Sequence, residues 1–143
     1  MSTEENKALV RRWEELWNQA NLALAEELFA PTFLLHDPSS PVEIRGPEGY
    51  KQDVLRFRSV FPDLHITLED LIAEGEKVVA RWTASGTHTG PLRSFPPTGR
   101  RVRLTGIDIF HIEDGKIAEA WSNADGLGML QQLGVVPAPG QAS

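Results

Sequence analysis

The spacing of apolar residues changes once along this chain, near Leu64, from a helical to a strand-like period. Before that point apolar residues recur every three or four positions, as they do on one face of an α-helix. After it they alternate with polar residues over four stretches, 65–72, 77–88, 101–112 and 116–123, which is typical of half-buried β-strands. Because the helices come first and the strands follow, we expect an α+β domain with an antiparallel sheet.

Three helices are predicted before the sheet. Ser2 and Glu5 form a capping-box pattern that opens the first, and Asn21 is placed to cap a short second helix that Pro31 ends. A third begins near Pro47, in whose first turn proline is favoured. The first and third helices each carry an apolar stripe, made of Leu9, Val10, Trp13, Leu16 and Trp17 in one and of Tyr50, Val54, Phe57, Val60 and Phe61 in the other.

The remaining segments are short. A strand is predicted over 33–37 and a helical turn or two over 126–133. We expect residues 1–134 to form one domain and 135–143 an irregular tail. Because a strongly twisted sheet of about four to six strands curls, helices across its concave side leave a cone that is open at one end. That opening is the candidate ligand site.

The turn between the last two strands decides which of their side chains share a face. A three-residue turn with Gly115 in the left-handed region would pair Ile112 with Lys116, whereas a two-residue turn would shift the pairing by one. We favour the three-residue turn, which places His111 and Asp125 on one face. We interpret that face as the pocket lining. It also carries Ile107, Ile109, Trp121 and Asn123.

The opposite face of these strands carries Asp108 among small and apolar side chains, and we expect it to be a contact between subunits. A homodimer or homotetramer through the sheet is therefore predicted. Only a shifted register would bring Asp108 or Glu119 into the pocket as a second acid.

Other pocket candidates come from the rest of the chain. Trp82 and His88 share one side of the strand over 77–88, and we favour that side as pocket wall, although a packing Trp and a rim His bonded to backbone fit the pattern equally well. His36 ends the short strand where a loop would reach the cone mouth, with pocket and core as even alternatives. The candidates from the helices are Trp17, Phe57 and Phe61.

Short motifs are spread over nearly the whole chain. They are Trp17-Asn18, Leu28-Phe29-Ala30-Pro31, His36-Asp37-Pro38, Phe61-Pro62-Asp63, Gly86-Thr87-His88-Thr89-Gly90, Pro97-Thr98-Gly99, Gly106-Ile107-Asp108, Gly115-Lys116-Ile117 and Gln131-Gln132-Leu133-Gly134. Together they resemble the SnoaL-like polyketide cyclases, a family with the nuclear transport factor 2-like cone fold.

The resemblance implies cofactor-independent chemistry, an intramolecular aldol condensation that closes a ring in a polyketide ester. Asp125 matches the acid/base aspartate of the family, and His111 matches a pocket histidine. The chain departs from the family pattern at Asn123 and Ala124, where most relatives have an aromatic residue or a second acid. The loop over 93–99 retains only the second half of the family's sequence, so the resemblance leaves the substrate open.

Composition excludes several other classes of function. Fourteen basic and twenty acidic residues give a net charge of −6, which opposes nucleic-acid binding. The chain has no cysteine, no Gly-x-Ser-x-Gly motif and no apolar run long enough to span a membrane. Its four histidines lack the helical spacing of metal ligands, so no metal site is expected. The acidic start is unlike a secretory signal, and we expect a cytoplasmic location.

Three hypotheses of function remain open. The first is an enzyme that uses Asp125 as a base, with His111 or His88 assisting, on a small apolar carbonyl compound. The second is a related isomerase or epoxide-hydrolase-like enzyme with two pocket acids. The third is a non-catalytic domain that binds a small ligand, because a fold does not fix a function.

Overall fold

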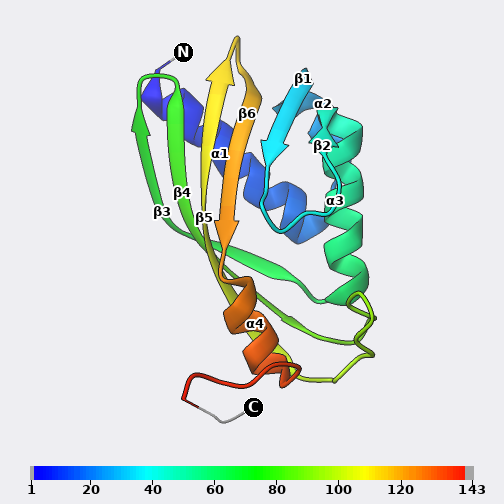
Figure 1. Cartoon of the computed structure of the whole chain (residues 1–143). Helices are drawn as coiled ribbons and strands as arrows, with labels where there is room; N and C mark the ends of the chain where they lie inside the picture. The colour runs from blue at the N-terminus through cyan, green and yellow to red at the C-terminus, as the bar shows by residue number, and fades with distance from the viewer. Residues whose placement is uncertain (1, 141–143) are drawn as a thin grey trace.

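The computed structural model describes residues 2–140 (Figure 1). The elements, in chain order, are α1 (Thr3–Gln19), α2 (Leu24–Leu28), β1 (Phe29–His36), β2 (Ile44–Arg45), α3 (Gly46–Val60), β3 (His65–Glu74), β4 (Lys77–Thr87), β5 (Arg101–Glu113), β6 (Lys116–Ala124) and α4 (Gly126–Leu133). Within the described part of the chain, no helix is long and apolar enough to cross a membrane. The predicted tail over 135–143 extends beyond this part, since 141–143 lie outside the described residues.

The six strands form one sheet in the order β2-β1-β6-β5-β4-β3. Strands β3 to β6 are antiparallel neighbours, as predicted. Strand β1 instead runs parallel to β6, with His36 opposite Trp121. An early strand therefore lies beside the last one and extends the sheet toward α3, which packs on β1 and β2.

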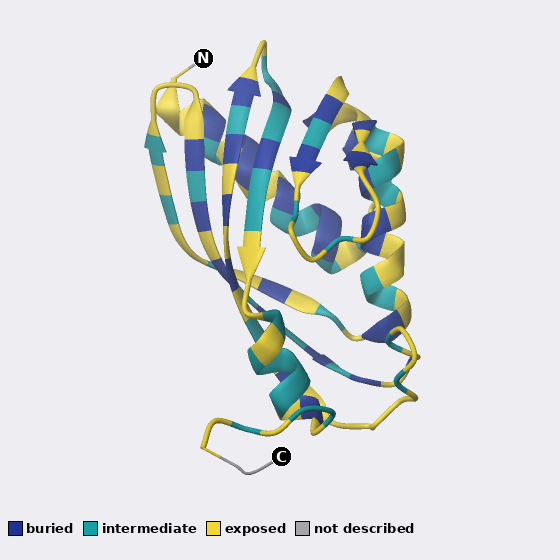
Figure 2. Cartoon of the chain, in the orientation of Figure 1, coloured by how far each residue is buried: buried dark blue, intermediate teal, exposed yellow. Residues whose placement is uncertain are grey.

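Helices α1 and α3 lie on the same side of the bent sheet (Figure 1). The capping box at Ser2 and Glu5 is present as predicted. The apolar stripe of α1 packs on β3 and β4, and Val10 and Leu16 are fully buried there. Figure 2 shows buried and exposed residues alternating along the long strands, so one face of the sheet meets the helices and the other faces outward. The predicted α+β class is confirmed.

The turn between β5 and β6 differs from the prediction. Asp114 and Gly115 both have positive φ, at 50° and 77°, and Glu113 pairs with Lys116. This is the two-residue turn that the sequence left as the alternative, and it suits Asp-Gly because both central positions of such a turn are left-handed. Ile112 pairs with Ile117 in the register of this turn, but the register shifts between His111 and Ile112, so that His111 lies opposite Glu119. The two shifts together restore the original alternation.

The prediction of which face lines the pocket is wrong. Ile107 and Ile109 are 48% and 36% exposed, and they lie on the outer face of the sheet with His111, Trp121 and Asn123. The face expected to be a subunit contact is the inner one, and it carries Asp108, which is only 4% exposed. Alternation gave the correct grouping of side chains but not the direction in which each group points.

Two shorter segments also differ from the prediction. Helix α2 begins at Leu24 after Ala23, which provides no side-chain cap, so Asn21 is not its capping residue. Strand β1 begins at Phe29 and includes Pro31, which was expected to end the helix. The pairing of β1 with β6 is interrupted between Phe29 and Leu34, so proline is tolerated there without an N–H to donate.

Candidate active site

A cavity of about 440 Å³ lies between the helices and the inner face of the sheet. Its walls are mainly apolar and come from helices α1 and α3 and from strands β1, β3, β4, β5 and β6. Residues of the loops after β1 and β4, together with α4, complete the lining. The polar side chains that reach this cavity therefore lie against apolar groups, which makes each of them a candidate for binding or chemistry.

Asp108 on β5 is one of these polar groups. Its Oδ1 accepts hydrogen bonds from Trp82 Nε1 at 2.9 Å and from Ser122 Oγ at 2.7 Å. Nothing among residues 2–140 hydrogen-bonds Oδ2, which leaves that oxygen available to a bound molecule. Burial raises the pKa of Asp108 to about 6, although the two hydrogen bonds act in the opposite direction.

A glycine on β5 makes room for the Trp82 indole that holds Asp108. Gly106 pairs with Trp82 across β4 and β5. A Cβ at Gly106 would lie 2.3 Å from Trp82 Cζ2, much closer than atoms pack. The missing side chain therefore lets the indole lie across β5 and place its N–H on the carboxylate two residues further along.

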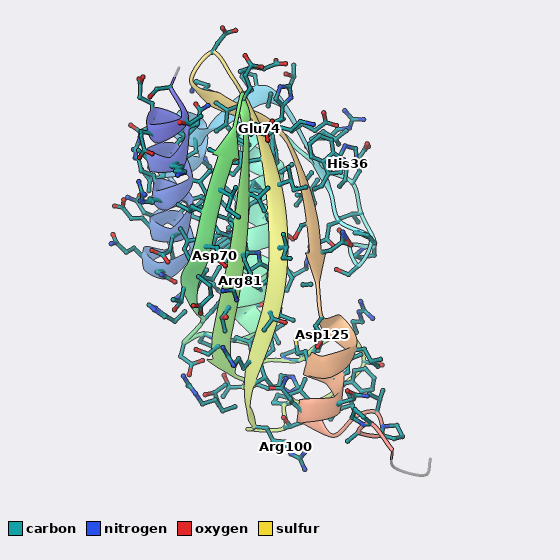
Figure 3. All side chains as sticks on the ribbon, turned by 90° about the vertical axis from the view of Figure 1, so that its left-hand side faces the viewer. His36, Asp70, Glu74, Arg81, Arg100 and Asp125 are labelled. Atoms are coloured by element: carbon teal, nitrogen blue, oxygen red, sulfur yellow. The ribbon has the colours of Figure 1, made fainter. Side chains whose placement is uncertain are left out.

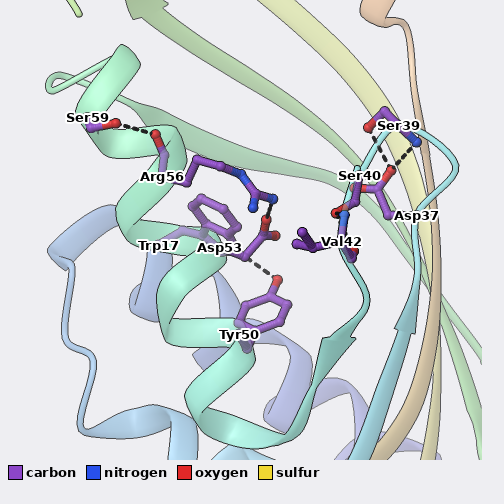
Figure 4. A network of polar contacts seen from close by, with 9 residues as sticks. All are labelled: Trp17, Asp37, Ser39, Ser40, Val42, Tyr50, Asp53, Arg56 and Ser59. Carbon is purple, nitrogen blue, oxygen red and sulfur yellow. Dashed lines mark hydrogen bonds and ion pairs between the residues drawn. The ribbon is translucent and has the colours of Figure 1, made fainter. Parts of the chain in front are cut away.

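A second buried carboxylate, Asp53, comes from α3 and is 4% exposed. It forms an ion pair with Arg56, which lies one turn further along the helix and also lines the cavity (Figure 4). Burial raises the pKa of Asp53 to about 6, and the charge of Arg56 opposes this rise. Each of Asp53 and Asp108 therefore ionises near the pH at which acid/base catalysts work best.

Tyr50 lies one turn before Asp53 on α3 and is 3% exposed. Its hydroxyl oxygen accepts two hydrogen bonds, from Trp13 Nε1 at 2.5 Å and from Trp17 Nε1 at 3.0 Å. Figure 4 shows the Trp17 bond beside Asp53. Burial, and then the charge of Asp108, raises the pKa of Tyr50 well above its ordinary value, so this side chain stays a neutral phenol.

Three of the pocket residues predicted from the sequence line the cavity: Trp17, Phe57 and Trp82. His88 is fully buried on the predicted side of β4, but it packs on Phe61 beside a second, smaller core cluster. Its Nδ1 accepts a hydrogen bond from the Thr98 backbone N–H, so it orders the loop after β4. Neither His88 nor Phe61 is among the cavity-lining residues.

Neither of the two residues expected to be catalytic, Asp125 and His111, is among the cavity-lining residues, although Ala124 and Gly126 on either side of Asp125 are. Asp125 is exposed and caps α4, accepting a hydrogen bond from the Gly128 backbone N–H at 2.9 Å. Figure 3 shows it at the end of β6, where α4 begins. Aspartate is one of the residues favoured at the position directly before a helix, where its side chain accepts a hydrogen bond from a backbone N–H of the first turn. His111 lies on the outer face, 3.2 Å from Glu76, and neither residue lines the cavity.

His36 also lies on the outer face of the sheet. Its ring stacks on Trp121, with centroids 5.4 Å apart, and its Nε2 is 2.5 Å from Glu119 Oε2. The loop that follows His36 does reach the cavity, through Asp37, Ser39 and Ser40. The prediction that this segment approaches the mouth is therefore confirmed for the loop but not for the imidazole.

Sequence reasoning missed two of the cavity's polar groups, Asp53 and Tyr50, and brought Asp108 into the pocket only for a shifted register. Asp53 and Tyr50 lie three apart, and Asp53 falls within the apolar stripe of α3, where a carboxylate is unusual. On β5, Asp108 likewise lies on the same buried face as Gly106 and Phe110. A carboxylate on an otherwise apolar face was the signal available in the sequence. For Asp108, using this signal also required knowing which face of the sheet is the inner one.

Comparison with known proteins agrees with this architecture. A family model for SnoaL-like polyketide cyclases matches residues 7–133. The aklanonic acid methyl ester cyclase DnrD of Streptomyces peucetius is 34% identical over 140 residues, which cover 94% of this chain and 92% of that protein. The nogalonic acid methyl ester cyclase of Streptomyces nogalater is 35% identical over 91 residues, which cover 62% of this chain and 67% of that protein.

A solved structure supports the fold independently. TsrD from Streptomyces laurentii superposes with a TM-score of 0.85 and 34% sequence identity, covering 95% of this chain and 99% of that one. The chain is thus a cyclase-type enzyme with the nuclear transport factor 2-like cone fold that the resemblance implied. It belongs to the SnoaL-like polyketide cyclase family.

Proposed function

We propose that this enzyme closes a ring in a polyketide methyl ester by intramolecular aldol condensation, with Asp108 as the acid/base group. The observation that carries this proposal is a carboxylate oxygen, Asp108 Oδ2, that borders an apolar cavity and has no hydrogen-bond partner among residues 2–140. Burial raises the pKa of this carboxyl to about 6 and so makes it a stronger base than an exposed aspartate.

The reaction needs only proton and electron-pair movements within the substrate. Asp108 Oδ2 takes a proton from the carbon next to a carbonyl, and the electrons of that C–H bond form an enolate. The enolate carbon attacks a second carbonyl carbon of the same molecule, which forms the new C–C bond and leaves an alkoxide. The carboxylic acid of Asp108 then returns its proton to that alkoxide, so atoms and charge balance.

The substrate class in this proposal rests on the cavity and on the relatives. Two relatives are named as methyl ester cyclases, one for aklanonic acid and one for nogalonic acid. An esterified substrate carries no carboxylate, which suits a mainly apolar cavity that already holds two carboxyl groups. Trp13, Trp17, Phe57 and Trp82 provide flat apolar surfaces of the kind that an aromatic polyketide would contact.

The isomerase and epoxide-hydrolase alternatives require two working acids. By position, Asp53 could be the second one. Its carboxylate is, however, engaged by the guanidinium of Arg56, while Asp108 Oδ2 is not engaged by any described residue. The site therefore favours a reaction that uses one free carboxylate as both base and acid.

A comparison of two variants tests this proposal. Aklanonic acid methyl ester and nogalonic acid methyl ester are incubated with the parent enzyme, with Asp108→Asn and with Asp125→Asn, and ring closure is followed by liquid chromatography. We expect Asp108→Asn to lower kcat by about 100-fold or more, because general-base catalysis commonly contributes 10²–10⁴-fold. Asp125→Asn should lower it much less, since this residue caps α4.

The opposite ranking would contradict the proposal and would restore Asp125 as the base. A parent enzyme that cyclises neither ester would show that the substrate class is different. The Asn variants keep an oxygen that can accept the hydrogen bonds of Trp82 or of Gly128, so both are expected to fold.

A further inference from the structure

We infer that Tyr50 is a further catalytic residue, whose O–H donates a hydrogen bond to the substrate carbonyl oxygen that becomes the enolate oxygen. This inference rests on the proposed function, because it assigns a partner to the proton abstraction by Asp108. The observation behind it is the hydrogen bonding of the phenol, which leaves its proton unused.

The hydroxyl oxygen of Tyr50 has both of its acceptor positions filled. An indole N–H can only donate, so Trp13 and Trp17 must each be donors in their contacts of 2.5 and 3.0 Å. The hydroxyl proton must then point elsewhere, and among residues 2–140 no group accepts it. Tyr50 is one of the residues that line the cavity, so a molecule bound there is the acceptor that we assign to this proton.

The surroundings of Tyr50 hold the ring in one orientation. Trp13 and Trp17 are four residues apart on α1 and therefore project on the same side of that helix. The ring also packs on Phe29 with a centroid distance of 4.3 Å and on Phe33 at 5.8 Å. A donor that is fixed before the reaction begins is the arrangement that best stabilises an oxyanion, because no reorganisation is needed as charge develops.

Tyr50 and Asp108 reach the same cavity from different elements of the fold. Tyr50 extends from α3 and Asp108 from β5, and both border the same cavity. The charge of Asp108 is close enough to raise the pKa of the phenol. A carbonyl compound held between them would place its oxygen at a neutral donor and its neighbouring C–H at a carboxylate.

A naphthol that cannot react tests the donor directly. The hydroxyl of 2-naphthol stands in for the enol, its anion stands in for the enolate, and its fluorescence reports which form is bound. Binding is measured in Asp108→Asn, where the carboxylate no longer repels the anion, and in Asp108→Asn with Tyr50→Phe. We expect the second protein to bind the anion about 10- to 100-fold more weakly, and the pKa of bound 2-naphthol to be about one to two units higher.

Asp108→Asn with Phe57→Leu is the matched control. Phe57 also lines the cavity but offers no hydrogen bond, so this change should alter the affinity without raising the pKa of the bound naphthol. Equal naphthol pKa values with and without the Tyr50 hydroxyl would overturn the inference. So would a rise in the Phe57→Leu control as large as that in Tyr50→Phe, and so would a failure of Asp108→Asn to bind 2-naphthol.

Tyr50→Phe leaves two buried indole N–H groups without an acceptor and could fail to fold, so a second measurement avoids it. Tyr50 is the only tyrosine of the chain, and growth on 3-fluorotyrosine labels this position alone. The fluorine makes the phenol a stronger donor, so the pKa of bound 2-naphthol should fall and the single ¹⁹F resonance should move as the naphthol ionises. A ¹⁹F resonance whose chemical shift stays the same as the bound naphthol ionises would contradict the inference.

These outcomes are separate from the test of the proposed function. Naphthol binding needs no turnover, so a parent enzyme that cyclises neither ester would leave the measured role of Tyr50 as an oxyanion donor intact. Conversely, Asp108→Asn could lower turnover while Tyr50→Phe leaves the binding and the pKa of 2-naphthol unchanged. That result would overturn this inference and leave the proposed function in place.

Discussion

Burial of the Asp108 carboxylate makes it a stronger base and also lowers the stability of the folded protein at neutral pH. Its surroundings provide two hydrogen bonds to one oxygen but little water, and burial raises its pKa to about 6. Between the ordinary aspartate pKa and that value, the folded protein binds a proton that the unfolded chain has already released. Raising the pH through this window therefore removes stability.

Replacing Asp108 with Asn should stabilise the enzyme at neutral pH. The amide cannot ionise, so the gain in unfolding free energy at pH 8 is on the order of 3 kcal/mol, from a shift of about two pKa units. Below about pH 4 both proteins are uncharged at this position, and the difference should disappear. Thermal unfolding of both proteins from pH 4 to 8 checks this, and equal stability at pH 8 would contradict it.

At the scale of elements, the pairing of β4 with β5 places Trp82 where its N–H donates a hydrogen bond to Asp108. Helix and strand positions followed from periodicity and capping, as at Ser2 and in the stripe of α1. The details of strand pairing did not, because the β5–β6 register depends on the turn and on a second shift between His111 and Ile112. Likewise, β2 has only two residues, too few to show a period.

Gly106→Ala should disturb both stability and activity. The added Cβ would collide with the Trp82 indole and force the donor away from Asp108, so we expect a loss of about 1–3 kcal/mol in unfolding free energy. Turnover should fall as well, because the carboxylate is then free to rotate. Gly126→Ala is the control for stability, as a Cβ there would meet nothing within 4 Å.

Calorimetric unfolding of the two glycine variants measures this difference. A Gly106→Ala protein as stable as the parent would mean that the indole can shift without strain. In that case Trp82 would not be the residue that fixes Asp108.

For the whole molecule, the sequence predicted the order of the helices and of every strand except β2, and hence the cone, but not which sheet face is inside. Both faces of β5 and β6 mix apolar and polar groups, with Ile109 and Trp121 on one and Phe110 and Asp108 on the other. The choice depends on where β1 and α3 pack, which is a long-range contact that no local pattern encodes. The site residues therefore had to be reassigned, although Trp17, Phe57 and Trp82 were found.

The outer sheet face carries a row of four apolar side chains and one histidine across five strands. The row consists of residues that pair in turn, namely Ile72, Val79, Ile109, Trp121 and His36. The charged pair Asp70 and Arg81 lies beside it on the same face (Figure 3). Such a row, bordered by both signs of charge, is suited to contact with a second copy.

We therefore propose that the expected homodimer forms through this outer face rather than through the face of Asp108. Ile109→Lys places a charge in the middle of the row and should convert the dimer to a monomer while leaving the fold intact. Analytical ultracentrifugation of the parent and the variant measures this. A parent protein that sediments as a monomer, or a variant with the parent's mass, would contradict the proposal.

The pH dependence of kcat/KM for ring closure tests the role of Asp108 most directly. The account predicts a rate constant that is level at high pH and falls about tenfold per unit below about pH 6, as the base becomes protonated. Asp53→Asn should keep this limb and move it to lower pH, since the charge of Asp53 raises the pKa of Asp108. A kcat/KM that is unchanged between about pH 8 and 5, or a limb that vanishes in Asp53→Asn, would contradict the account.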